Sequence, residues 1–191
     1  MKILTTTSLL AFSVVALSYC ESALAEQKLI PAQSEISFVT KQMGVPLEGH
    51  FKKFDAQISF DTAKPDAAKI AFTVDSGSAT LGAPESDAEL PKAAWFNVAK
   101  FPQASFQSST VKALGGGKYQ ISGKLTIKGN VKDIDVPVAL SQANGVTTAS
   151  GQFALKRLNY KIGEGEWADT SMVADDVQVK FKLAIGGMGK L

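Results

Sequence analysis

Residues 119–127 read Tyr-Gln-Ile-Ser-Gly-Lys-Leu-Thr-Ile, an alternation of apolar or small residues with polar ones. Because successive side chains of a β-strand point to opposite faces of the sheet, this period of two predicts a strand with one buried face. The tight-turn sequence Lys128-Gly129-Asn130 follows, and Gly129 is expected to adopt a positive φ. A second alternating segment then places on one face Ile134, Val136, Val138 and Leu140. Together these residues predict an antiparallel hairpin.

The same alternation recurs on both sides of this hairpin. Further strands are predicted at residues 34–40, 47–61, 70–74, 104–108, 149–155 and 177–185. Within 47–61 the apolar parity changes at Lys52-Lys53, which predicts a bulge, a bend or two separate strands. Pro137 cannot donate a ladder hydrogen bond, so its strand is expected to be an edge or to be locally unpaired there.

One segment breaks the alternation. Ser86 to Glu89 has the pattern of a capping box, and Pro91 stops or restarts the turn that follows. Residues 92–99 are expected to form a short second helix. About eight or nine antiparallel strands with this helical excursion predict an all-β fold, either a closed barrel or a β-sandwich, which periodicity alone does not separate.

The first 25 residues have the pattern of a secretory signal peptide. Lys2 precedes an apolar run from Ile3 to Leu17, and Ala23-Leu24-Ala25 is a small-x-small cleavage site. The run is too short for a membrane span. Cys20 raises the alternative of a lipoprotein, although Tyr19 is bulky where that signal has a small residue. We expect residues 1–25 to be removed and residues 26–191 to form a single domain in the periplasm.

Composition excludes several function classes. The chain has 20 basic and 18 acidic residues, a net charge of +2, so it has no strong positive electrostatic field that would favour binding of nucleic acid. A single His and a single Cys exclude a zinc finger or iron–sulfur cluster, and no metal or required cofactor is expected. His50 has no partner nucleophile, because the chain lacks a Gly-x-Ser-x-Gly motif. We therefore expect no enzymatic activity, and a homodimer remains open.

The sequence is rich in large apolar side chains. Phenylalanines fall on the inner parity of several strands, and Gly49, Gly123 and Gly151 interleave with them. This combination predicts a lumen with room for a long, slim apolar guest. A leucine at position 123 or 151 is therefore expected to enter the lumen. Arg157 shares the inner parity, and a position at the barrel mouth beside Asp175 or Asp176 is predicted for it.

Several segments, taken together in order, resemble the YceI-like family of secreted bacterial proteins. They are Ser34-x-Ile36-x-Phe38, Gly49-x-Phe51, Trp95-Phe96, Phe101-Pro102, residues 123–129, Arg157-x-Asn159-Tyr160 and Val177-x-Val179. The resemblance implies an eight-stranded, antiparallel, lipocalin-like barrel with a helical cover. It also implies binding of a polyisoprenoid chain, such as a polyprenyl lipid or the tail of an isoprenoid quinone.

The predicted function is thus a carrier for an apolar isoprenoid lipid. The side chains expected to line the apolar tube are Phe38, Phe51, Phe72, Trp95, Phe96, Phe106, Ile121, Leu125, Val138, Phe153, Leu155, Val179 and Phe181, with Trp95 and Phe96 as its lid. Two alternatives stay open. One is a hydrolase that uses paired carboxylates, drawn from Asp75, Asp87, Asp175 and Asp176, and the other is a packed surface or adhesion module without a ligand.

Overall fold

The computed structural model describes residues 26–191, so the predicted leader lies outside the described residues. Within that range the chain forms strands β1 (Lys28–Leu29), β2 (Glu35–Gln42), β3 (Val45–Phe51), β4 (Phe54–Ser59), β5 (Lys69–Asp75), β6 (Ala79–Thr80), β7 (Gln103–Gly115), β8 (Lys118–Ile127), β9 (Asn130–Ala143), β10 (Val146–Lys156) and β11 (Asp176–Gly186). One short helix, α1 (Pro84–Glu89), and five single turns of 3-10 helix complete the described residues.

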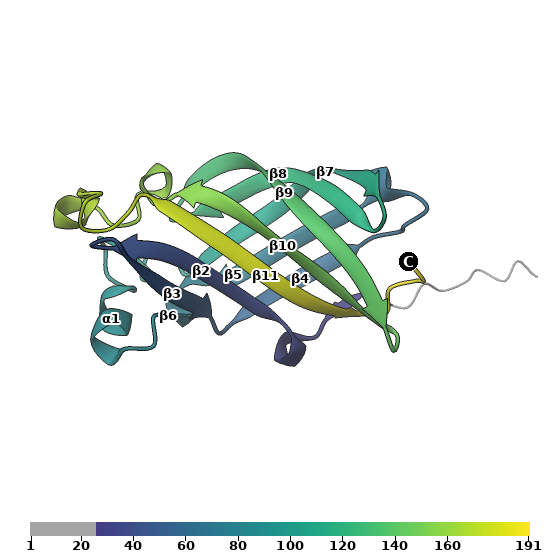
Figure 1. Ribbon diagram of the computed structural model, residues 1–191, viewed down its shortest axis with the longest axis horizontal. Helices are drawn as coiled ribbons and strands as arrows, with labels where there is room; N and C mark the ends of the chain where they lie inside the picture. The colour runs from purple at the N-terminus through teal and green to yellow at the C-terminus, as the bar shows by residue number, and fades with distance from the viewer. Residues whose placement is uncertain (1–25) are drawn as a thin grey trace, which may run out of the picture.

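The strands close into a ring (Figure 1). β1 and β2 pair one after the other with the same edge of β11. β4 pairs with β1 and β3 pairs with β2, so β4 and β3 also lie one after the other. β5 and β6 pair with β4 and β3 respectively, so three pairs of short strands each act as one interrupted strand. With β7 to β11 they form an eight-stranded antiparallel barrel. The predicted barrel is confirmed, and the closed ring excludes the β-sandwich.

Two local irregularities of the barrel occur where the sequence predicts them. β3 ends at Phe51 and β4 begins at Phe54, so the change of parity at Lys52-Lys53 is confirmed as a break between two strands. Pairing of β9 with β10 runs from Ala143↔Val146 only as far as Val138↔Gly151, and it stops at Pro137. Pro137 still pairs with Gln120 of β8, so it is locally unpaired on one side only.

The turn after β8 has the predicted backbone. Gly129 has φ +74° and the preceding Lys128 has φ +48°, so both central residues are left-handed, as a two-residue hairpin requires. The prediction for Gly129 is confirmed. A β-carbon there would also lie 2.8 Å from Cε1 of Phe101, so glycine is required by both backbone and space.

The helical excursion differs from the prediction. α1 begins at Pro84 with Ala83 as its N-cap, and no capping box forms at Ser86. Asp87 instead accepts hydrogen bonds from Thr80 Oγ1 (2.5 Å) and from the backbone N–H of Leu81 (2.6 Å), tying α1 back to β6. Residues 92–99 form consecutive turns in place of the predicted second helix. Asn97, at φ +50°, interrupts any helix in this segment.

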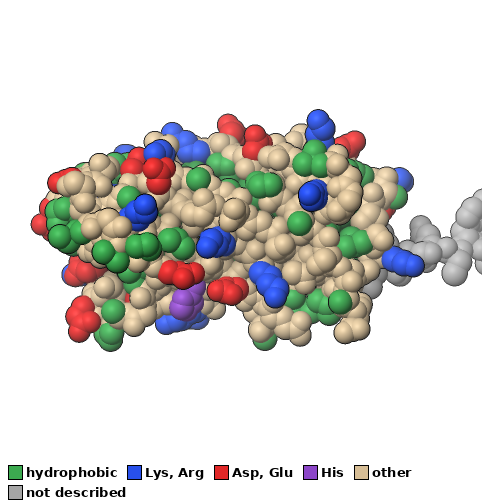
Figure 2. Space-filling model, viewed as in Figure 1, with side chains coloured by type: hydrophobic (Ala, Val, Ile, Leu, Met, Phe, Trp, Pro, Cys, Tyr) green, Lys and Arg blue, Asp and Glu red, His purple; other side chains and the backbone are tan. Residues whose placement is uncertain are grey.

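The two ends of the barrel are different. Figure 1 places α1, the β2–β3 hairpin and the chain between β10 and β11 at one end, which we call the mouth. The C-terminus lies at the other end. On the face shown in Figure 2, acidic and basic side chains are interspersed, which agrees with the small net charge.

Candidate ligand-binding site

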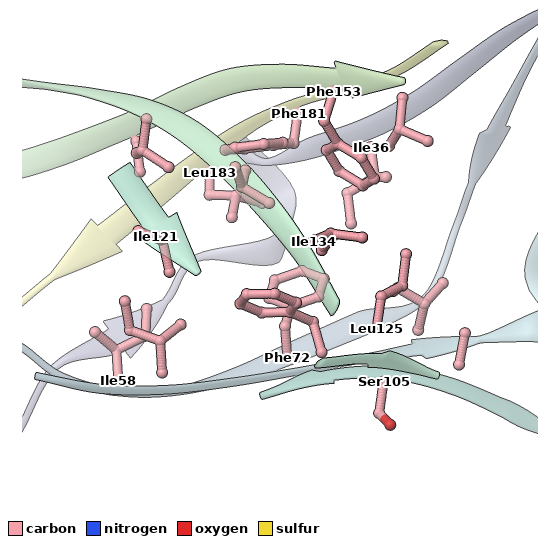
Figure 3. A pocket seen from close by; sticks show the side chains of 18 of the residues that line it. Ile36, Ile58, Phe72, Ser105, Ile121, Leu125, Ile134, Phe153, Phe181 and Leu183 are labelled. Carbon is pink, nitrogen blue, oxygen red and sulfur yellow. The ribbon is translucent and has the colours of Figure 1, made fainter. Parts of the chain in front are cut away.

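The barrel encloses an apolar inner chamber of about 210 Å³. A single buried water needs only ~10–15 Å³, so this space is a built cavity and not a packing defect. Figure 3 shows aliphatic and aromatic side chains from opposite walls pointing toward one another, among them Ile58, Phe72, Ile121, Phe153 and Phe181. Ser105 is the labelled exception, and its hydroxyl points away from them. The inner chamber can therefore hold hydrocarbon and offers it almost no polar contact.

An outer chamber of about 180 Å³ lies at the mouth. The two chambers are neighbours, because five residues line both of them: Phe51, Phe96, Ile127, Leu155 and Val179. The outer chamber differs from the inner one in chemistry, because its lining also includes Thr40, Gln42, Ser86, Glu89 and Arg157. The outer chamber therefore offers polar groups at the mouth that the inner chamber lacks.

Every predicted wall residue lines at least one chamber. The inner chamber is lined by Phe51, Phe72, Phe96, Phe106, Ile121, Leu125, Val138, Phe153, Leu155, Val179 and Phe181, and the outer chamber by Phe38 and Trp95 together with the shared residues. Trp95 and Phe96 come from the turns after α1, as expected for a cover. Contact of these side chains with a ligand stays a prediction.

The expectation that glycines leave the lumen open is wrong. A β-carbon on Gly123 would lie 2.5 Å from Cζ of Phe106, and one on Gly151 would lie 2.6 Å from Cζ of Phe181. The ring of Phe38 covers Gly49 in the same way. Each glycine is thus a platform on which a phenylalanine ring lies, and a leucine at 123 or 151 would meet that ring instead of free space.

Arg157 lies at the mouth, buried to 2% exposure, and its partners are not carboxylates. Its guanidinium donates to the carbonyls of Ile162, Gly163, Trp167, Val173 and Ala174. The predicted acids are engaged elsewhere, since Asp175 accepts from the backbone N–H of Leu158 and Asp176 pairs with Lys156. Burial lowers the pKa of Arg157, and the charge of Asp175 acts in the opposite direction.

Lys128 forms a second buried cationic hub that the sequence analysis did not identify. Its Nζ donates to the carbonyls of Ala93 (2.7 Å) and Lys161 (2.6 Å) and to Glu164 Oε2 (2.8 Å). The hydrogen bond from Lys128 lowers the pKa of the Glu164 carboxyl. Lys128 therefore ties the segment after α1 to the segment after β10 at the mouth.

Sequence reasoning also missed part of the lining. Trp167, which is not among the predicted wall residues, lines the outer chamber and packs against Trp95 with ring centroids 5.5 Å apart. Its rarity was the available signal, because the chain has just two tryptophans. Toward the other end of the barrel, Phe60 and Tyr119 meet edge to face at 5.2 Å and line the inner chamber with Met188.

The carboxylates proposed for a hydrolase do not form a pair at either chamber. Asp75 accepts from the backbone N–H of Gly77, and Asp87 holds α1 against β6. Among the described residues, Glu89 is the one acid that lines a chamber, and Lys92 pairs with it. Residues 26–191 hold no cluster of three potential metal ligands. No helix in that range is long and apolar enough to cross a bilayer.

The sequence model of the YceI-like domain matches residues 28–185. The chain belongs to the YceI-like family. Protein YceI of Salmonella arizonae is 35% identical to it over 138 residues, which cover 70% of this chain and 72% of that protein.

Two solved structures extend this result. The crystal structure of BcnA from Burkholderia cenocepacia is 44% identical, with a TM-score of 0.79 over 82% of this chain and 98% of that one. A polyisoprenoid-binding domain from Saccharophagus degradans, implicated in plant cell wall breakdown, has a TM-score of 0.68 at 16% identity, over 85% of this chain and 98% of that one. The YceI-like barrel is therefore common to all of them.

Proposed function

We propose that this YceI-like domain is a periplasmic carrier that holds one isoprenoid lipid, a polyprenyl lipid or an isoprenoid quinone, along the barrel axis. The observation that carries the proposal is the apolar inner chamber beside a partly polar outer chamber. Removing hydrocarbon from water gains roughly 0.8 kcal/mol per CH₂, so a long tail gives a large driving force without any polar contact.

Two further observations support this assignment. The Saccharophagus domain with the same fold is described as binding polyisoprenoid, which favours this ligand class. The leader predicted at residues 1–25 favours the periplasm, where a water-soluble shield would be needed between two membranes.

Native lipid content tests the proposal. The full chain is purified from the periplasm of a Gram-negative host without detergent, and extracted lipids are identified by mass spectrometry. An isoprenoid in stoichiometric amount is expected. Protein that carries none, and that takes up none on incubation with quinone or polyprenol, would overturn the carrier and favour a packed module.

A matched pair of variants on β10 locates the ligand. Ala149 is 7% exposed and lines the inner chamber, whereas Ala154 on the same strand is exposed on the outer face. Ala149→Leu is expected to lower the amount of bound lipid because its side chain enters the chamber, and Ala154→Leu is expected to leave it unchanged. Equal lipid content in both variants, with both folded, would place the lipid outside the barrel.

A further inference from the structure

Met188 closes part of the inner chamber at the end opposite the mouth. It lines that chamber, and it packs against the core cluster that contains Phe60 and Tyr119 and against the cluster that contains Ile185. Phe60 follows the end of β4, Tyr119 lies at the start of β8, and Ile185 lies at the end of β11. In Figure 1 the C-terminus lies at this end of the barrel. We call Phe60, Tyr119 and Met188 the floor of the chamber.

The segment that carries Met188 lies outside the strands. β11 ends at Gly186, and Gly187 has φ +75°, a left-handed conformation that glycine adopts without strain. Gln142 Nε2 of β9 donates to the carbonyl of Gly189 (3.0 Å) and so joins this segment to the barrel. The thioether side chain of methionine is flexible and fills irregular gaps. The side chain at position 188 can therefore change without disturbing the pairing of a strand.

We propose that Met188 sets the longest tail that the inner chamber accommodates, because a hydrocarbon chain that extends along the barrel axis from the mouth ends against this side chain. This inference rests on the proposed function, with the tail in the inner chamber. Each isoprene unit adds hydrocarbon that is removed from water until the tail reaches the floor, and units beyond that length gain nothing more. Met188 is thus a residue that determines specificity for tail length, whatever the headgroup.

Substitutions at position 188 move the floor in opposite directions. Met188→Ala removes the atoms beyond Cβ and is expected to lengthen the accepted tail, whereas Met188→Trp fills more of the chamber and is expected to shorten it. Met188→Leu keeps an apolar side chain of similar volume and should retain the wild-type limit. Met43→Ala is the matched control, because Met43 is 76% exposed at the mouth and lines neither chamber.

The assay uses prenyl alcohols whose tails increase by one isoprene unit at a time, from geraniol upward, in competition with a fluorescent apolar probe. The wild-type affinity is expected to rise with tail length and then to level off at a limiting length. Met188→Ala is expected to bind the first alcohol beyond that limit about tenfold more tightly than the wild type does, since tenfold is about 1.4 kcal/mol and burial of about two further CH₂ groups supplies it. Met188→Trp should level off at a shorter alcohol, and Met43→Ala should give the wild-type profile.

The shape of this profile distinguishes a floor from a merely structural side chain. Loss of packing alone would weaken the binding of every alcohol by the same factor and would leave the limiting length unchanged. The same limiting length in the wild type, Met188→Ala and Met188→Trp would therefore overturn the inference, and so would a wild-type affinity that keeps rising to the longest alcohol. Failure of every alcohol to bind the wild type would instead overturn the carrier function.

A photocrosslinking experiment tests the same inference without any variant. The wild type is loaded with the alcohol of limiting length that carries a diazirine at the end of its tail, and the crosslinked residues are mapped by mass spectrometry. Crosslinks to Met188 and to its floor neighbours Phe60 and Tyr119 are expected. Crosslinks confined to residues of the outer chamber, such as Trp167, would show that the tail end does not reach the floor and would overturn the inference.

Discussion

Gly151→Ala adds only one methyl group, yet it should destabilise the barrel strongly. The added β-carbon would lie 2.6 Å from Cζ of Phe181 on the inner side of β10 and would overlap the carbonyl oxygen of Pro137. The Phe181 ring can rotate away, but the Pro137 carbonyl belongs to the β9 backbone at the point where β9 and β10 separate. Relief therefore requires a shift of a strand.

The magnitude follows from overpacking. Extra methyl groups in well-packed interiors cost about 1–3 kcal/mol, and a rigid backbone partner places this site near the upper end, at about 2–3 kcal/mol. For a domain of this size, 1 kcal/mol shifts the melting temperature by roughly 2–4 °C, so a fall of about 4–12 °C is expected. Thermal unfolding followed by circular dichroism measures it.

Two companion variants make this test specific. Gly186 is a β11 glycine with ordinary φ, and a β-carbon there would lie 3.7 Å from Cδ1 of Ile30, at normal contact distance. Gly186→Ala should therefore melt at or slightly above the wild-type temperature, because alanine restricts the unfolded chain. Adding Phe181→Leu to Gly151→Ala should recover only part of the loss. An unchanged melting temperature for Gly151→Ala would refute the platform role of this glycine.

Two other predictions concern the mouth. Lys128→Met leaves two carbonyls and Glu164 without their shared donor and should lower the free energy of unfolding by about 2–3 kcal/mol, measured by urea denaturation; a loss below about 0.5 kcal/mol would contradict the hub. The hydrogen bond from Thr80, followed by that from the N–H of Leu81, lowers the pKa of Asp87 from its ordinary 3.8. The stabilising contribution of the Asp87 carboxylate is therefore present above about pH 3.8 and is lost as the pH falls through the lowered pKa. Asp87→Asn should be less stable than the wild type at pH 7 and should lose less stability on acidification. Parallel curves of stability against pH for the two proteins would contradict this.

The barrel strands could be predicted because their signal is local. Alternation fixes which residues of each strand face inward, and a change of parity at Lys52-Lys53 is visible in the sequence itself. Pro137 shows by its missing N–H where pairing fails. The same local pattern places Phe106, Phe153 and Phe181 on cavity walls.

What could not be predicted depends on contacts between distant residues. Whether Gly151 opens the lumen or supports a ring depends on the rotamer of Phe181 across the strand pair, and the sequence does not encode it locally. A carboxylate partner was expected for Arg157, because a neighbouring acid is the simplest way to neutralise a buried guanidinium. The actual partners are carbonyls from residues 162 to 174, whose positions follow from loop backbone without periodicity.

The same loop backbone determines how the buried cations of the mouth are used. Irregular segments over a chamber leave carbonyls that no strand can satisfy, and buried carbonyls must find donors. Arg157 satisfies five of them with one side chain, and Lys128 satisfies two more while it binds Glu164. Every donor used in this way is withdrawn from ligand binding. The buried positive charge of the mouth therefore holds its irregular loops in place, and of these two side chains only Arg157 lines the outer chamber.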